Sequence, residues 1–370
     1  MRTRIHLPIL ILFLIITCFC HSSEGTTNED SKFIDLVIKL ENNSIGGSLV
    51  IPSNLNTKSL VIMSSGSGPQ DRDETLEGFK IFKVIAEHLA SKGIASFRYD
   101  DRGVGISTGD FVNSTIEDQT NDLEGIIEYF KSSEANNFDS FILFGHSQGG
   151  ILAGKVAVEN ESVKKVVLMA APSVPLVEVV TYQIRQEYSG LEISKTLIEA
   201  DVSAHNKLMT AIEDDKNIEQ AYHLFRKTTE SILYKTSSER EVNSLKIRQK
   251  ATDKANEFKI IYGLPSLTSF LYYDPSKDLE QLNIPVLSLF GGLDFQVPIF
   301  QNKDRMENAL LKSGVNYDFK VFNNANHFFQ NARTGKREEY SELKKEFVDG
   351  FLDVISDWII KNNKLKNEQN

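Results

Sequence analysis

The hydrophobic positions along the chain alternate between short apolar runs and longer amphipathic segments. The run at 59–63 is continuously apolar, as expected for a strand buried on both faces of a sheet. Similar short runs follow at 94–99, 141–144 and 163–169. Between them, apolar residues recur every three or four positions, which is typical of helices. The pattern therefore predicts an α/β protein with a mostly parallel sheet flanked by helices.

This alternation stops after Pro172 and resumes at 284–290, where another apolar run appears. The residues between them form charged, amphipathic patterns with few strand signals. They could be a second, separate domain, but a helical insertion is simpler because the strand pattern resumes afterwards. We therefore expect an α/β core made of 21–172 and 281–370, with a helical lid inserted at 173–280.

Other parts of the core follow the same pattern. The helix near 115–131 is expected to begin at Ser114 or Thr115, with Asp118 as its capping partner. Further strands are expected at 33–40, 45–52 and 317–322, and further helices near 76–91, 299–313 and 340–361.

Residues 1–20 stand apart from the globular pattern. Two arginines precede an apolar stretch at 7–16, which is short for a membrane span and typical of a secretory signal. We expect cleavage after Cys20 and export of the protein to the periplasm or the exterior. An uncleaved membrane anchor is one alternative, and lipid attachment at Cys18 or Cys20, giving a lipoprotein, is another.

Charge and cysteine content narrow the function classes. The chain has 41 basic and 51 acidic residues and a formal net charge of −10, which argues against nucleic acid as a partner. Both cysteines lie in the predicted signal. The mature chain is therefore expected to have no disulfide, no thiol nucleophile and no cysteine metal site.

A serine lies in a predicted tight turn after the strand at 141–144. Residues 145–149 read Gly-His-Ser-Gln-Gly, and a helical segment follows. The two glycines remove side chains that would clash in such a turn, and the amide of Gln148 would point toward a forming oxyanion. This context favours Ser147 as a nucleophile over a chance cluster of small residues.

A serine nucleophile needs a base and a group that orients the base. His327 is expected on a loop that follows a late strand, where a base could reach Ser147. Asp294 comes directly after the strand at 284–290 and is the candidate acid. The alternatives are an ordinary loop histidine and a turn or N-cap aspartate.

The loop after the strand at 59–63 could supply a further oxyanion amide. Gly66 and Gly68 allow the backbone to approach a substrate closely, and Ser67 lies between them. A plain glycine turn is the alternative. A phosphate-binding loop is not favoured, because no Gly-Lys-Ser/Thr sequence follows.

Taken together, these motifs resemble the α/β-hydrolase superfamily, in particular bacterial esterases and serine-aminopeptidase-like hydrolases, over nearly the whole chain after residue 20. The resemblance implies Ser147 as the nucleophile, with Asp294 and His327 as its partners. It also implies the amides of Ser67 and Gln148 as oxyanion donors. The matching pieces, in chain order, are residues 65–74, residues 100–107, residues 145–149, Asp294 and His327.

Other positions in these motifs differ from the family pattern or have a structural role. Many relatives have a histidine where this chain has Ser65, which affects the first oxyanion donor. The resemblance implies a structural role for Asp100 and Arg102 as a loop-fixing pair. The charged run at 71–74 is distinctive, and it would either hold the oxyanion loop or face the substrate entrance.

The sequence as a whole predicts an exported serine hydrolase that cleaves an ester of a small or medium acyl substrate through an acyl-enzyme. A peptidase or a thioesterase would use the same triad, and a non-catalytic binding protein on this fold is the alternative from another class. No metal or organic cofactor is implied. The expected partner is a small acyl substrate, selected by the lid, and membrane contact would occur through the signal segment or a lipid anchor.

Cleavage of the signal can be tested on protein purified from its native host. We expect intact-mass spectrometry to find a mature chain that starts at or near His21, because the apolar stretch before it is typical of a removed signal. An intact Met1 would contradict this prediction. A lipid-modified cysteine would instead place the protein on a membrane surface.

Overall fold

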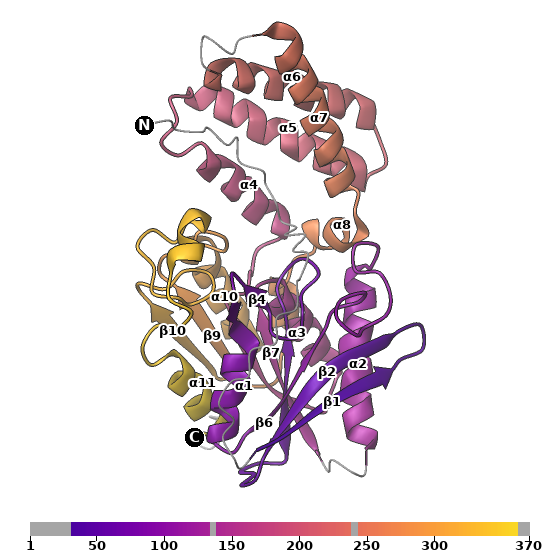
Figure 1. Cartoon of the computed structure of the whole chain (residues 1–370), viewed down its shortest axis with the longest axis vertical. Coiled ribbons are helices and arrows are strands. Elements are labelled where there is room, and N and C mark those ends of the chain that lie inside the picture. Colours follow the sequence, from indigo (N-terminus) through magenta and orange to yellow (C-terminus); the bar gives the residue numbers. More distant parts are fainter. Residues whose placement is uncertain (1–30, 134–137, 238–242, 362–370) are drawn as a thin grey trace. The chain divides into compact units, whose positions relative to one another are not determined.

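The computed structural model describes residues 31–133, 138–237 and 243–361 (Figure 1). The predicted signal segment at 1–20 lies outside these residues. Among the helices in the described ranges, none is both long and apolar enough to cross a membrane.

An eight-stranded sheet forms the centre of the core (Figure 1). Its strand order is β1-β2-β6-β3-β7-β8-β9-β10; β2 is antiparallel to both of its neighbours, and all pairs from β6 to β10 are parallel. This arrangement confirms the predicted α/β fold with a mostly parallel sheet. The strands are β1 Ser31–Lys39, β2 Ser44–Pro52, β3 Ser59–Ser64, β6 Ala95–Tyr99, β7 Ser140–His146, β8 Val163–Met169, β9 Val286–Gly291 and β10 Tyr317–Phe322.

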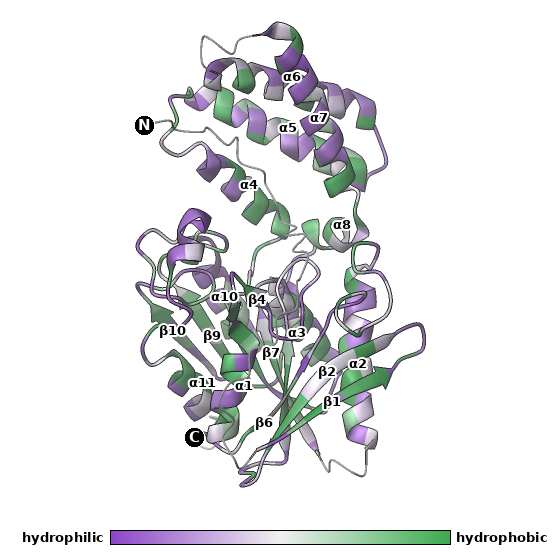
Figure 2. Cartoon of the chain, viewed as in Figure 1, coloured by the Kyte–Doolittle hydropathy of each residue, from purple (hydrophilic) through white to green (hydrophobic). Residues whose placement is uncertain are grey.

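Helices cover both faces of this sheet, so its central strands are apolar (Figures 1 and 2). α1 and α11 pack together on one face, while α2, α3, α9 and α10 form the other layer. Phe82 of α1 and Phe144 of β7 meet edge to face in the buried cluster under α1 and α11. The core helices are α1 Ile81–Ser91, α2 Ile116–Ser132, α3 Gln148–Glu159, α9 Ser276–Leu279, α10 Ile299–Ser313, the 3-10 helix η1 Arg337–Glu342 and α11 Phe351–Ile360.

The helix expected near 76–91 begins later than its apolar periodicity suggested. Its first residues form a small hairpin instead, with strands β4 (Thr75–Leu76) and β5 (Phe79–Lys80). Glu77 and Gly78 between them have φ angles of 47° and 82°, which a right-handed helix does not allow. The hairpin follows the charged run at 71–74 directly.

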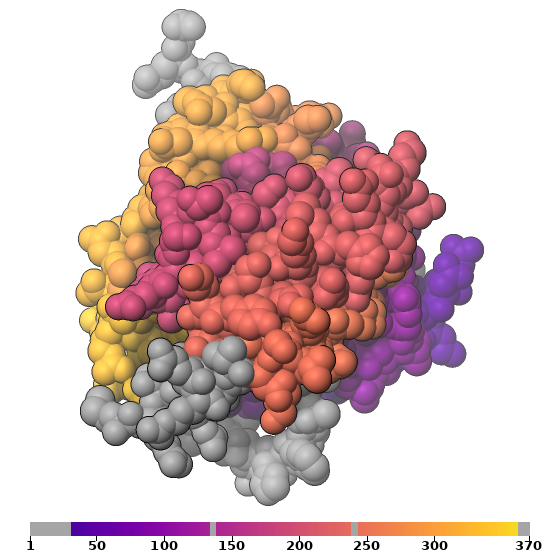
Figure 3. Space-filling view, turned by 90° about the horizontal axis from the view of Figure 1, so that it is seen from above, coloured from indigo at the N-terminus to yellow at the C-terminus, as the bar shows by residue number. Residues whose placement is uncertain are grey.

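Residues 175–273 form a compact helical unit that is distinct from the core unit of 31–174 and 274–361. Figure 3 shows the surface formed by its helices, coloured pink to orange. Its centre is aromatic: His205 lies edge-on to Phe225 at 4.5 Å between ring centroids. The helices are α4 Leu176–Glu187, α5 Lys195–Glu213, α6 Ile218–Thr236, α7 Ser244–Tyr262 and α8 Pro265–Leu271.

The core residues at the two ends of this unit bind the same helix. The backbone amide of Ser173 donates a hydrogen bond to Asn302 Oδ1 at 2.9 Å, and Arg305 Nη2 donates to Asp274 Oδ2 at 2.7 Å. Asn302 and Arg305 lie one turn apart on α10. The chain therefore leaves the core and re-enters it at one place.

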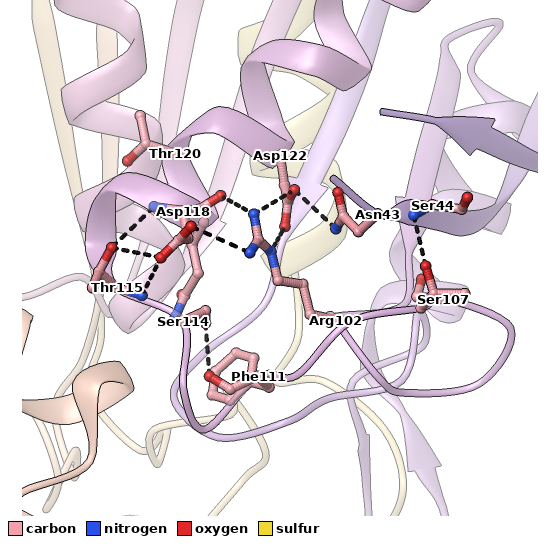
Figure 4. A network of polar contacts seen from close by, with 12 residues as sticks. Asn43, Ser44, Arg102, Ser107, Phe111, Ser114, Thr115, Asp118, Thr120 and Asp122 are labelled. Carbon is pink, nitrogen blue, oxygen red and sulfur yellow. Dashed lines mark hydrogen bonds and ion pairs between the residues drawn. The ribbon is translucent and has the colours of Figure 1, made fainter. Parts of the chain in front are cut away.

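Asp100 and Arg102 both fix loops, as the resemblance implied, but they do not pair with each other. Arg102 donates to Asp122 of α2 and to the carbonyl of Asp118, at 3.0 and 2.8 Å (Figure 4). Thr115 and Asp118 form the predicted capping box of α2. Arg102 thus ties the loop after β6 to the start of α2.

Candidate active site

Ser147 occupies a strained turn between β7 and α3. Its φ is 50°, in the left-handed region that is rare for residues other than glycine. A Cβ on Gly145 would lie 2.3 Å from the carbonyl oxygen of Gly149, and one on Gly149 would lie 2.2 Å from that of Ser64. No side chain fits at either position, so the turn requires both glycines.

Asp294 and His327 follow β9 and β10, the two parallel strands at the end of the sheet. His327 Nδ1 contacts Asp294 Oδ2 at 2.8 Å, and both side chains are buried. The other oxygen, Asp294 Oδ1, accepts the backbone amides of Gln296 and Val297 at 2.8 Å each. Asp294 therefore acts as a turn aspartate and as the partner of the histidine, with one oxygen for each contact.

The contact with Asp294 determines which nitrogen of His327 is free. An ionised carboxylate accepts, so Nδ1 carries the proton and Nε2 is left as the basic nitrogen. Burial lowers the pKa of His327, and although the Asp294 carboxylate opposes this, the net shift is downward. The imidazole is therefore neutral at neutral pH and able to take a proton.

The loop after β3 lies on the same pocket as the serine and the histidine. Gly66, Ser67, Ser147 and His327 all line a cavity of about 40 Å³. Within the described part of the chain, the amides of Ser67 and Gln148 donate no hydrogen bond, as oxyanion donors require. Of the predicted site residues, Ser67, Ser147 and His327 therefore line one pocket. Asp294 contacts His327 but is not part of that lining, and Gln148 is the first residue of α3.

The carboxyl group of Asp101, just after β6, holds this loop. Asp101 Oδ2 accepts the amide of Gln70 at 2.8 Å and the hydroxyl of Ser65 at 3.2 Å. Ser65 therefore anchors the loop through its side chain. In the described ranges, no group of three or more His, Cys, Asp or Glu side chains is arranged to hold a metal ion.

Glu74 belongs to the charged run that was expected to hold the oxyanion loop or face the substrate entrance, whereas His146 was not predicted to take part in the site. His146 Nδ1 contacts Glu74 Oε1 at 2.6 Å, and both side chains line the pocket of Ser147. The other ring nitrogen of His146, Nε2, contacts the main-chain carbonyl of His327 at 3.1 Å, so His146 also contacts the loop of the predicted base. A carboxylate soon after the Gly-Ser-Gly loop, together with a histidine before the serine, was the signal available in the sequence.

A family model described as serine aminopeptidase, S33, matches residues 76–331. Among curated proteins, Esterase EstD of Thermotoga maritima is 27% identical over 325 residues, which cover 86% of this chain. The alignment spans 66% of the length of that relative.

Solved structures share the fold at low sequence identity. The esterase Pf2001 of Pyrococcus furiosus superposes with a TM-score of 0.53 at 12% identity, over 92% of this chain and 97% of its own. VinJ superposes with a TM-score of 0.50 at 15% identity, over 88% of this chain and 98% of its own. At these identities the similarity shows the fold alone.

Substitution of the three predicted catalytic residues tests their roles. We expect Ser147→Ala, His327→Ala and Asp294→Asn each to lower kcat on a p-nitrophenyl ester by at least about 10³-fold. The losses should not multiply in double variants, because the three residues act as a unit. Thermal unfolding of each variant controls for misfolding. Near-normal turnover by Asp294→Asn would show that another carboxylate orients His327.

The lowered pKa of His327 predicts the acidic side of the pH profile. Because the neutral imidazole is the active form, kcat/KM should stay level as pH falls from neutrality. It should decline only below about 6.5, the ordinary pKa of histidine. The measurement is kcat/KM against pH on an ester without ionising groups. A half-maximal point above this value would contradict the prediction.

Proposed function

Because the chain belongs to the serine aminopeptidase S33 family, whose model matches residues 76–331, we propose that it is a serine hydrolase that cleaves a carboxylic ester. The observation that carries this proposal is the buried Asp294–His327 contact beside the strained turn of Ser147. The name of the Thermotoga maritima relative, an esterase, supports an ester as the bond cleaved.

In this mechanism Ser147 Oγ attacks the acyl carbonyl while His327 Nε2 takes its proton. Asp294 stabilises the imidazolium that forms. The amides of Ser67 and Gln148 bind the oxyanion, and His327 then returns the proton to the leaving alcohol. Water hydrolyses the acyl-enzyme by the same steps, so the chemistry needs no metal or organic cofactor.

A peptidase is the second candidate function, because the matched family model is described as an aminopeptidase. A thioesterase would use the same residues. The three activities differ in the leaving group, which His327 must protonate, and this difference is accessible to kinetics. A non-catalytic binding protein is separated from all three by its lack of reaction with a serine-directed fluorophosphonate.

Acyl selection is proposed to lie outside the core. The cavity around Ser147 is lined mostly by polar and charged side chains of the core. An apolar acyl chain needs an apolar lining, so the helical unit of 175–273 is the proposed selector of a small or medium acyl chain. Residues 1–20 support the further proposal that the enzyme acts after export, on small molecules outside the cytoplasm.

A substrate panel on the mature protein tests the proposed activity. We expect p-nitrophenyl and alkyl esters to give a higher kcat/KM than thioesters or aminoacyl amides of the same acyl group, because an amine is the poorest leaving group. Ser147→Ala is the matched control and should abolish turnover of every substrate. A preference for aminoacyl amides over the matched esters would favour the peptidase.

A further inference from the structure

The four side chains of the charged run at 71–74 do not all have the same kind of contact. Asp71 accepts amides of its own turn, Arg72 pairs with Asp100, and Asp73 pairs with an arginine of β6. Glu74 differs because its φ is 47° and its side chain is turned inward, where it is 3% exposed. Arg72 and Asp73 therefore fasten the loop to the core, Asp71 contacts only its own turn, and Glu74 reaches the site.

Glu74 and His146 link two loops through a continuous set of hydrogen bonds. Glu74 Oε1 accepts the amide of Gly66 at 2.7 Å and contacts His146 Nδ1 at 2.6 Å. His146 Nε2 donates to the main-chain carbonyl of His327 at 3.1 Å. One end of the link is thus the oxyanion loop, and the other end is the residue proposed as the base.

The hydrogen-bond partners of His146 show where the protons of the Glu74–His146 pair lie. A carbonyl can only accept, so His146 Nε2 carries a proton, and a second proton lies at the contact of Nδ1 with Glu74. Burial lowers the pKa of His146, but Glu74, the carbonyl of His327 and Asp294 together outweigh burial and raise the pKa above its ordinary value. The pair therefore shares one proton at this contact and is neutral overall, as burial demands.

The link passes close to the nucleophile. A Cβ placed on Gly66 would lie 3.1 Å from Glu74 Oε1, 3.3 Å from Ser147 Cβ and 3.4 Å from His146 Nδ1. The second oxygen of Glu74, Oε2, is buried without a hydrogen-bond partner in the described ranges. An unsatisfied carboxylate oxygen costs stability, so folding alone does not explain this residue.

We propose that Glu74 and His146 are a positioning pair, which holds the oxyanion loop and the loop of His327 around Ser147 as one unit. The inference rests on the proposed serine hydrolase function. It assigns to Glu74 and His146 no contact with the substrate. Their effect is on turnover, because a loop displaced by a fraction of an ångström weakens the oxyanion contacts that are made in the transition state.

Glu74→Gln tests this role with little change in volume. Glutamine offers one acceptor oxygen in place of two, and its amide cannot share the proton at His146 Nδ1 as the carboxyl group does. We expect kcat on a p-nitrophenyl ester to fall by about 10- to 100-fold, with KM changed by less than about threefold. The rate of Ser147 labelling by a fluorophosphonate should fall by a similar factor, since the probe uses the same oxyanion donors.

Asp71→Asn is the matched control. This substitution removes a carboxylate three positions before Glu74. The amide oxygen of the asparagine can still accept the backbone amides of the turn, so kcat should stay near the wild-type value. All rates are measured well below the melting temperature of each variant. Wild-type kcat in Glu74→Gln, or a loss that disappears on cooling, would overturn the proposal.

A double-variant cycle tests the pairing itself. If Glu74 and His146 act together, Glu74→Gln combined with His146→Gln should lower kcat no more than the larger single loss. Losses that multiply would overturn the pairing. A wild-type protein that the probe does not label would overturn the proposed hydrolase function and the pair with it, whereas equal labelling of wild type and Glu74→Gln overturns the pair alone.

Discussion

Close backbone packing around the turn at Ser147 is the constraint on which the rest of the site depends. A Cβ on Gly149 would lie 2.2 and 2.4 Å from the carbonyl oxygens of Ser64 and Ser65, and one on Gly150 would lie 2.3 Å from Ala171 Cβ. The segments after β3 and β8 therefore touch the turn directly. Because these contacts involve backbone and Cβ atoms, which cannot rotate away, the oxyanion loop and the nucleophile are placed relative to each other by the sheet itself.

Carboxylates supply the second layer of positioning. Asp100, Asp101 and Glu74 each accept hydrogen bonds from backbone amides of the loops after β3 and β6. Asp100 is also paired with Arg72. An ion pair such as that of Asp100 with Arg72 contributes little net stability where it is buried, because desolvation offsets its attraction. The directional contacts of these carboxylates instead give each loop one conformation, which a catalytic site needs more than it needs stability.

The sequence predicted those features that depend on local pattern. Ser147, Asp294 and His327 could be placed because each follows a recognisable apolar strand, and parallel strands end at one edge of a sheet. Two helices were wrong in extent, since the periodicity at 76–91 and 340–361 does not register turns such as those at Glu77 and Gly350. The specific role of Glu74 within the charged run was not predicted, because it depends on a contact with His146, 72 positions away.

The attachment of the helical unit to the core has a consequence for how the chain folds and for how it can be altered. Val166 of β8 pairs with Val286 of β9, so the sheet closes across the whole insertion, and closure of so long a loop is slow. Ser173 and Asp274 are both held by α10, however, so a helical unit that folds first brings its own ends together. The strands then meet as though a short connection joined them. The same junction makes the unit modular, since another insertion or a brief linker could span these two residues without disturbing the sheet.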